Sequence, residues 1–205
     1  DFVEKDDVPF IVVSKIHEPQ PKIISGTKLF EGAQIEALDQ AMKKKGMPVG
    51  PIALMDEVGI DVGAHVMSGD IADVVKSREG LVVSKGLLKM FEAGYLGKKN
   101  KKGYYKYDGK NGKRNGANPH AYQFFGNPPK IELAFEEMTW RPLLLMINEA
   151  VMCLEEGILS TPTDGDLGAV FGLGFLPFTG GPFRFADAYG ISELVKLMEE
   201  YAKKF

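Results

Sequence analysis

The sequence predicts an all-α protein made of a duplicated helical unit, and three observations support this prediction. Apolar residues recur at helical spacing over most of the 205-residue chain. A glycine-proline turn followed by a helical pattern occurs twice, at Gly50-Pro51 and again at Gly181-Pro182. A basic loop lies between the two copies, so we expect two helical repeats joined by this loop.

The composition argues against several classes of protein. With 44% hydrophobic and 26% charged residues the chain can bury a core, and its formal net charge of −3 gives no general bias toward nucleic acid or an anionic membrane. No apolar run reaches the roughly 18 residues of a membrane helix. The acidic start, DFVEKDDVPF, is unlike a signal or transit peptide, so we expect a mature protein or an internal piece of one.

The single cysteine, Cys153, rules out an intramolecular disulfide and fits a reducing compartment. It lies in an apolar helical pattern with no base nearby in sequence, so we expect a core residue and not a nucleophile. Cysteine and histidine do not combine at the spacing of metal ligands, and no metal is predicted.

The first helical repeat, with its closing loop, is expected over residues 31–108. Residues 1–30 form an irregular N-terminal segment with one short strand, because two prolines and a glycine in HEPQPKIISG preclude a continuous helix. Gly46 ends the first helix, Asp61 is placed to cap the third, and Gly94 to end the fourth. The helical patterns of this repeat cover residues 34–45, 51–58, 62–76 and 83–94.

The second helical repeat is expected over residues 129–205, after a linker at 109–128. The tyrosine-rich run from Tyr104 to Tyr107, before this linker, is suited to a brief hairpin. Pro142 should either begin or kink the long helix of the second repeat. The helical patterns of this repeat cover residues 130–156, 163–171 and 182–189, and the chain from Ser192 onward.

The duplication also pairs acidic residues. The segments GPIALMDEVG and GPFRFADAYG align without a gap, and Asp56 in the first coincides with Asp187 in the second. Upstream, Asp39 corresponds to Asp166 once a small insertion is allowed. We expect Asp56 and Asp187 to anchor a backbone amine or a helix end, and not to converge as catalytic carboxylates.

The second copy lies in a glycine-rich stretch, residues 174–190, which raises the question of a phosphate-binding loop. A dinucleotide loop needs G-x-G-x-x-G between a strand and a helix. The nearest match, Gly172-Leu173-Gly174, follows a helical pattern and has no strand before it. We therefore interpret these glycines as packing devices.

Three segments resemble one family. KKKGMPVGPIALMDEVGIDVGAHV is similar to the first helical C-terminal domain of 3-hydroxyacyl-CoA dehydrogenases, and GYLGKKNKKGYYKY to the loop that closes this domain. NEAVMCLEEGILSTPTDGDLGAVFGLGFLPFTGGPFRFADAYG resembles the C-terminal region of the multifunctional fatty-acid β-oxidation enzymes, and most of all their mitochondrial member, the trifunctional protein α subunit. The resemblance covers roughly residues 31–200. It implies a duplicated dehydrogenase C-terminal-like domain whose pseudo-dimeric repeats replace the two subunits of simpler dehydrogenases.

The resemblance also implies a role. In this family the multifunctional chain hydrates trans-2-enoyl-CoA and oxidises 3-hydroxyacyl-CoA with NAD, and a partner thiolase subunit finishes the cycle. The partners implied are an acyl-CoA substrate, the N-terminal Rossmann and hydratase domains of the parent enzyme, and the thiolase. The location implied is mitochondrial, with membrane association only through the parent complex.

Features of the family that carry chemistry do not occur in this chain. It has no strand followed by G-x-G-x-x-G, so NAD is expected to bind to a Rossmann domain outside it. None of His17, His65 and His120 stands in the family's His-Phe-Phe-x-Pro segment, and no catalytic residue is assigned. The isolated chain is predicted to be inactive. The alternative is a catalytically inert helical scaffold that binds acyl-CoA or a protein partner.

The basic loop is the best candidate site. Its predicted substrate-binding residues are Lys98, Lys99, Lys101 and Lys102, in a run of eight cations answered in the nearby sequence only by Asp108. Coenzyme A carries a 3′-phosphate and a diphosphate, which such a loop attracts. The alternative is a solvated surface loop. The interleaved tyrosines also suit nucleic acid, which the net charge and the resemblance disfavour.

His65 lies on the third predicted helix beside its apolar stripe. We expect it to be buried and neutral, without an acid–base role.

Overall fold

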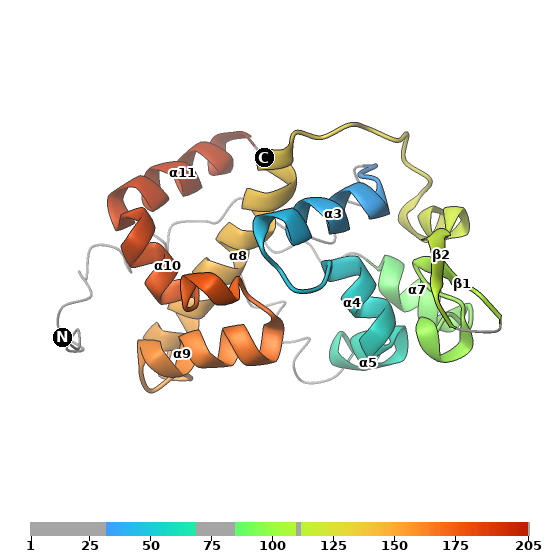
Figure 1. Cartoon of the computed structure of the whole chain (residues 1–205), viewed down its shortest axis with the longest axis horizontal. Coiled ribbons are helices and arrows are strands. Elements are labelled where there is room, and N and C mark those ends of the chain that lie inside the picture. The colour runs from blue at the N-terminus through green and yellow to red at the C-terminus, as the bar shows by residue number, and fades with distance from the viewer. Residues whose placement is uncertain (1–31, 69–84, 110–111, 205) are drawn as a thin grey trace. The chain divides into compact units, whose positions relative to one another are not determined.

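The computed structural model describes residues 32–68, 85–109 and 112–204 (Figure 1). The chain divides into two compact units. Of the described residues, those in the ranges 32–45 and 49–139 form the first unit, and those in the ranges 46–48 and 140–204 form the second. The predicted all-α class is confirmed, because helices make up most of both units. The predicted limits of the two repeats stay a prediction.

The first unit begins with helices that follow the glycine and proline signals. Pro51 opens its helix at the first position, where its missing N–H costs nothing. Asp61 is not the N-cap of the next helix, as we had predicted, because Gly59 takes that position with φ 115° and Asp61 falls in the first turn. The helix predicted over residues 62–76 ends at Val66, and residues 69–76 lie outside the described residues. The helices here are α3 (Ile35–Lys45), α4 (Pro51–Val58), α5 (Ile60–Val66) and α7 (Gly86–Glu92).

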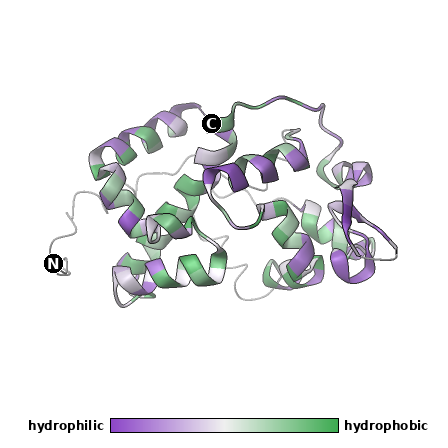
Figure 2. Cartoon of the chain, in the orientation of Figure 1, coloured by the Kyte–Doolittle hydropathy of each residue, from purple (hydrophilic) through white to green (hydrophobic). Residues whose placement is uncertain are grey.

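The predicted linker contains regular structure. The brief hairpin is confirmed, since β1 (Tyr105–Tyr107) pairs antiparallel with β2 (Arg114–Ala117). A 3₁₀ turn, η1 (Lys98–Asn100), precedes the hairpin, and a longer one, η2 (Pro119–Phe125), follows it. Figure 2 shows mostly hydrophilic residues over the hairpin and η1. The core of the first unit includes Ile35, Leu38, Met42, Ile60 and Met90, and the hairpin adds the buried ring of Tyr105.

The second unit is built around α8 (Phe135–Glu155), whose first residues belong to the first unit. Pro142 lies inside α8 and does not begin it. The single helix predicted over 163–171 is instead α9 (Pro162–Gly168) followed by a π-helical turn, η3 (Ala169–Leu173). The short turn η4 (Pro177–Thr179), α10 (Pro182–Tyr189) and α11 (Ile191–Lys204) complete the unit.

The core of the second unit includes residues of α8 and of the glycine-rich stretch. Leu143 and Ile147 of the predicted apolar stripe are fully buried, as are Phe175 and Leu176. Cys153 is only half-buried, so our core assignment for it was too strong. No helix of the described ranges is both long and apolar enough to cross a membrane.

Candidate functional site

The basic loop, residues 97–103, is fixed to the first unit by the carboxylate of Asp56. This side chain is fully buried at the end of α4 and accepts hydrogen bonds from the backbone N–H groups of Tyr104 and Tyr105, each at 2.9 Å. The Tyr107 hydroxyl donates a third bond at 3.0 Å. Gly103 lies against the same carboxylate, where a Cβ atom would collide with it. Asp56 is therefore the backbone anchor that its position predicted.

A second buried carboxylate, that of Asp39 in α3, also binds the hairpin and joins it to the start of α4. It accepts the N–H groups of Ile52 and Ala53 at the start of α4, at 2.8 and 2.9 Å. The Tyr105 hydroxyl donates to it at 2.6 Å, so the hairpin is tied to the same carboxylate that caps α4. Burial raises the pKa of both Asp39 and Asp56. The start of α4 and the hairpin that follows the loop are therefore joined through one buried carboxylate.

Two of the four predicted lysines are engaged in ion pairs. Lys98 Nζ lies 2.6 Å from Glu57 Oε2 of α4, and Lys99 Nζ lies 2.8 Å from Asp61 Oδ1 of α5. The bond from Lys99 lowers the pKa of Asp61. Asp108 is the only acidic residue in the nearby sequence, but the fold also brings two carboxylates from about forty residues earlier to these lysines. These two lysines hold the loop against α4 and α5.

The other two lysines meet no carboxylate in the part of the chain that the structure describes. Lys101 Nζ donates to the Gly109 carbonyl oxygen at 2.5 Å, and Lys102 Nζ lies 5.4 Å from the centre of the Tyr95 ring. A carbonyl dipole and an aromatic face orient an ammonium group but do not neutralise it. Within residues 97–103, the lysines whose charge no carboxylate of the described residues neutralises are therefore Lys101 and Lys102.

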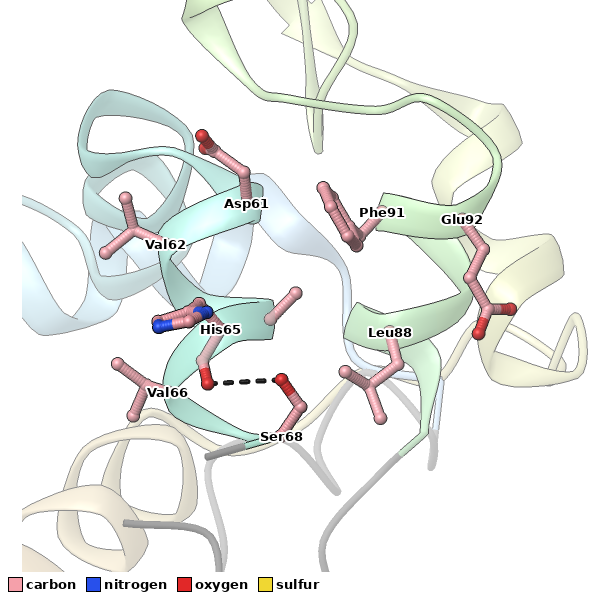
Figure 3. A pocket seen from close by; sticks show the side chains of 9 residues that line it. Asp61, Val62, His65, Val66, Ser68, Leu88, Phe91 and Glu92 are labelled. Atoms are coloured by element: carbon pink, nitrogen blue, oxygen red, sulfur yellow. Dashed lines mark hydrogen bonds between the residues drawn. The ribbon is translucent and has the colours of Figure 1, made fainter. Parts of the chain in front are cut away.

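An open groove of about 730 Å³ lies between α5 and α7 (Figure 3). In the figure, Phe91 and Leu88 lie on the α7 side, and Val62 and Val66 on the α5 side. Asp61 lines this groove and also binds Lys99, so the groove and the basic loop adjoin. The remaining lining residues are Ala64, His65, Ser68 and Glu92.

His65 contradicts our expectation of burial, because its side chain is exposed and lines the groove. It lies one turn after Asp61, and this i,i+4 spacing was visible in the sequence. The error arose because only one face of α5 packs against the core, through Ile60 and Ala64. Its backbone carbonyl accepts the Ser68 hydroxyl at 3.2 Å. No bond to a carboxylate orients its ring in the described structure, so we assign it no proton-transfer role.

The second unit has a capping carboxylate equivalent to Asp39, but the basic loop has no counterpart among its described residues. Asp166 Oδ1 accepts the Phe183 N–H at 2.8 Å at the start of α10, and Gly181 lies against Asp166. The glycine-rich stretch is thus a packing element, as predicted, because a carboxylate already takes the helix N-terminus that a phosphate would need. Our prediction that Asp187 is an anchor was wrong. It is exposed and makes no hydrogen bond among the described residues.

The second unit also exposes large apolar side chains. Phe171 of η3 is 83% exposed and Phe178 of η4 is 75% exposed, and Leu167 and Leu173 are also exposed. Soluble monomers rarely leave several neighbouring large apolar groups in water. In the described ranges, no three side chains of metal-ligand type gather in one place.

A protein-family model matches part of the chain. Residues 25–107 match the model of the 3-hydroxyacyl-CoA dehydrogenase C-terminal domain. The anchored basic loop lies within these matched residues.

The most similar relatives found include fatty acid oxidation complex α subunits of bacteria. That of Vibrio parahaemolyticus is 42% identical over 177 residues, which cover 86% of this chain and 24% of the relative. That of Shewanella putrefaciens is also 42% identical over 177 residues, with 86% and 25% covered. The chain thus spans about a quarter of the length of the relatives it matches.

The fold also resembles a solved structure, the dehydrogenase part of multifunctional enzyme 1 from C. elegans. The match has a TM-score of 0.51 and 22% identity, and covers 74% of this chain and 32% of the other. It supports the predicted dehydrogenase-type helical fold.

Proposed function

We propose that the chain is the helical portion of a multifunctional fatty-acid β-oxidation enzyme and that its basic loop binds the phosphates of acyl-CoA. The observation that carries this proposal is the anchored basic loop, in which the charges of Lys101 and Lys102 are not neutralised by a carboxylate in the described residues. The homology to fatty acid oxidation complex α subunits supplies the substrate class.

We assign the two pairs of lysines different roles, one in holding the loop and one in contacting the ligand. Lys98 and Lys99 fix the loop through Glu57 and Asp61, so the loop loses little conformational freedom on binding. Lys101 and Lys102 supply point charges for the 3′-phosphate and the diphosphate of coenzyme A. The prediction that all four lysines serve substrate binding is thus narrowed to two that contact the ligand and two that hold the loop.

The N-termini of α4 and α10 do not fit the diphosphate of NAD. A dinucleotide diphosphate needs free N–H groups at a helix N-terminus. At α4 these groups already bind Asp39, and at α10 they bind Asp166, and either carboxylate repels a diphosphate. We propose that a Rossmann domain outside this chain binds NAD, and that this chain alone does not oxidise 3-hydroxyacyl-CoA.

The remaining parts of the proposal rest on homology and resemblance. The partners are Rossmann and enoyl-CoA hydratase domains of the same polypeptide and a thiolase subunit. The location is mitochondrial, and contact with a membrane occurs only through the complex. The exposed apolar surface around Phe171 and Phe178 favours this role over the second candidate, an inert scaffold that stands alone.

Calorimetric titration of the chain with free coenzyme A and with lauroyl-CoA, at 50 and 300 mM salt, tests the proposal. We expect both ligands to bind, and binding to weaken with salt because phosphate contacts are screened. The absence of binding by free coenzyme A at low salt would contradict the proposed role of the loop. Turnover of 3-hydroxyacyl-CoA with NAD by this chain would contradict its predicted inactivity.

A further inference from the structure

We propose that the groove between α5 and α7 receives the acyl chain of the ligand whose phosphates lie on the basic loop. This inference rests on the proposed function and adds the location of the second half of the ligand. It concerns residues 61–68 and 88–92, which no comparison assigns to a binding site.

The walls of the groove are suited to a hydrocarbon chain. Phe91 is 45% exposed and Val62 42% exposed, and Val66 and Leu88 also line the groove. In Figure 3, Phe91 and Leu88 point from α7 toward α5, whereas Val62 and Val66 lie on the side of α5 turned away from α7. Each of these side chains leaves apolar area in water that a ligand tail would cover. The volume of about 730 Å³ lies within the roughly 300–1,000 Å³ of small-molecule sites.

The order of charges from the loop to the groove matches an amphiphile with an anionic head. Lys101 and Lys102 carry the uncompensated positive charge of the loop. Lys99 of the same loop forms an ion pair with Asp61 that is neutral as a pair, and Asp61 also lines the groove. Phe91 and Leu88 of α7 line the groove as well. A head group at the loop therefore places a flexible tail at the mouth of the groove.

The charge of Glu92 also limits which ligand the groove can hold. Glu92 lines the groove, so a free fatty acid would bring its carboxylate toward like charge. An acyl thioester carries no charge at its carbonyl end, and its phosphates lie many bonds away. The groove thus favours a fatty acyl group joined to a distant anionic carrier over a free fatty acid.

Titration with coenzyme A and with its butyryl, octanoyl and lauroyl thioesters tests the inference. A partly open apolar groove should strengthen binding about twofold to fourfold for each methylene it covers. We expect the affinity of the wild-type chain to rise from butyryl-CoA to lauroyl-CoA. Phe91→Ser and Leu88→Ser should flatten this rise and leave the affinity for free coenzyme A unchanged.

The matched control is Phe171→Ser, which removes an exposed phenylalanine of the second unit and should leave the rise intact. Phe91→Trp gives an independent readout, since the natural tryptophan, Trp140, belongs to the second unit. Its emission should shift to shorter wavelength with lauroyl-CoA and not with coenzyme A. Binding of coenzyme A without any dependence on chain length would overturn this inference alone. Loss of coenzyme A binding would overturn the proposed function instead.

Discussion

Asp39 and Asp166 occupy equivalent positions in the two units, and each caps the start of a helix. Each is a buried carboxylate that accepts backbone N–H groups at the start of the helix that follows a Gly-Pro turn. The glycine of that turn, Gly50 in one unit and Gly181 in the other, lies against the carboxylate. Asp39 differs in one respect, because it also accepts the Tyr105 hydroxyl and so connects the helix start to the hairpin.

Asp39→Asn and Asp166→Asn should each destabilise the protein by about 1–3 kcal/mol, because an amide group turns one acceptor into a donor that faces an N–H. Asp39→Asn should cost more, since the Tyr105 hydroxyl loses its acceptor as well. Urea unfolding followed by circular dichroism measures both. A larger loss for Asp166→Asn, or none for either, would show that the carboxylates do not have equivalent roles.

The hairpin tyrosines predict loss of stability at alkaline pH. Burial, followed by the charge and bond of Asp56, raises the pKa of the Tyr107 hydroxyl above its usual value near 10, and burial raises that of Tyr104. The unfolded chain releases these protons first, so the free energy of unfolding should fall as pH rises above about 10. Tyr107→Phe should reduce this slope by at most about 1.4 kcal/mol per pH unit.

Urea midpoints between pH 8 and pH 11 measure the slope. Lysines also titrate in this range, so the comparison is between Tyr107→Phe and the wild type. Tyr189→Phe is the control, because Tyr189 is an exposed residue outside the hairpin. Equal slopes for wild type and Tyr107→Phe would show that the Tyr107–Asp56 contact does not govern the alkaline transition.

Two phenylalanines of the second unit should respond in opposite ways to truncation. Phe175 is fully buried, so Phe175→Ala should cost about 3–5 kcal/mol. Phe171→Ala removes an 83% exposed side chain and should change stability by less than about 0.5 kcal/mol. Phe171→Ala should also reduce the binding of a hydrophobic dye, because it removes part of the exposed apolar surface that we propose packs against a partner. A large stability loss for Phe171→Ala would show that this residue is part of the core.

The starts and ends of helices were predictable from sequence where glycine and proline mark them. The Pro51 and Pro182 positions are of this kind, because their signals are local. The contacts of the basic loop were not predictable in the same way. Lys98 meets Glu57 only because the chain returns to α4 forty-one residues later, and no periodicity encodes that return. The exposure of His65 likewise depends on which face of α5 packs, which tertiary structure alone decides.

The duplication was visible in sequence, but its divergence was not. Asp56 and Asp187 align without a gap, yet only Asp56 holds a loop. The first copy is followed by Gly103 and the tyrosine run, whose backbone N–H groups need that acceptor. The second copy is followed directly by α11, so Asp187 has no loop to hold. Asp187 therefore lacks the anchoring role of Asp56, because the loop that Asp56 binds was not duplicated with it.

Comparison of two double variants tests the central claim most directly, namely that Lys101 and Lys102 contact the coenzyme A phosphates. One variant is Lys101→Gln/Lys102→Gln and the other is Lys98→Gln/Lys99→Gln. Both remove two positive charges, so titration with free coenzyme A at 50 mM salt shows whether the position of the lysines, and not the net charge alone, determines the affinity. We predict a loss of about tenfold or more for the first variant, with a weaker salt dependence, and a smaller loss for the second. Equal losses, or none in the first variant, would contradict the account.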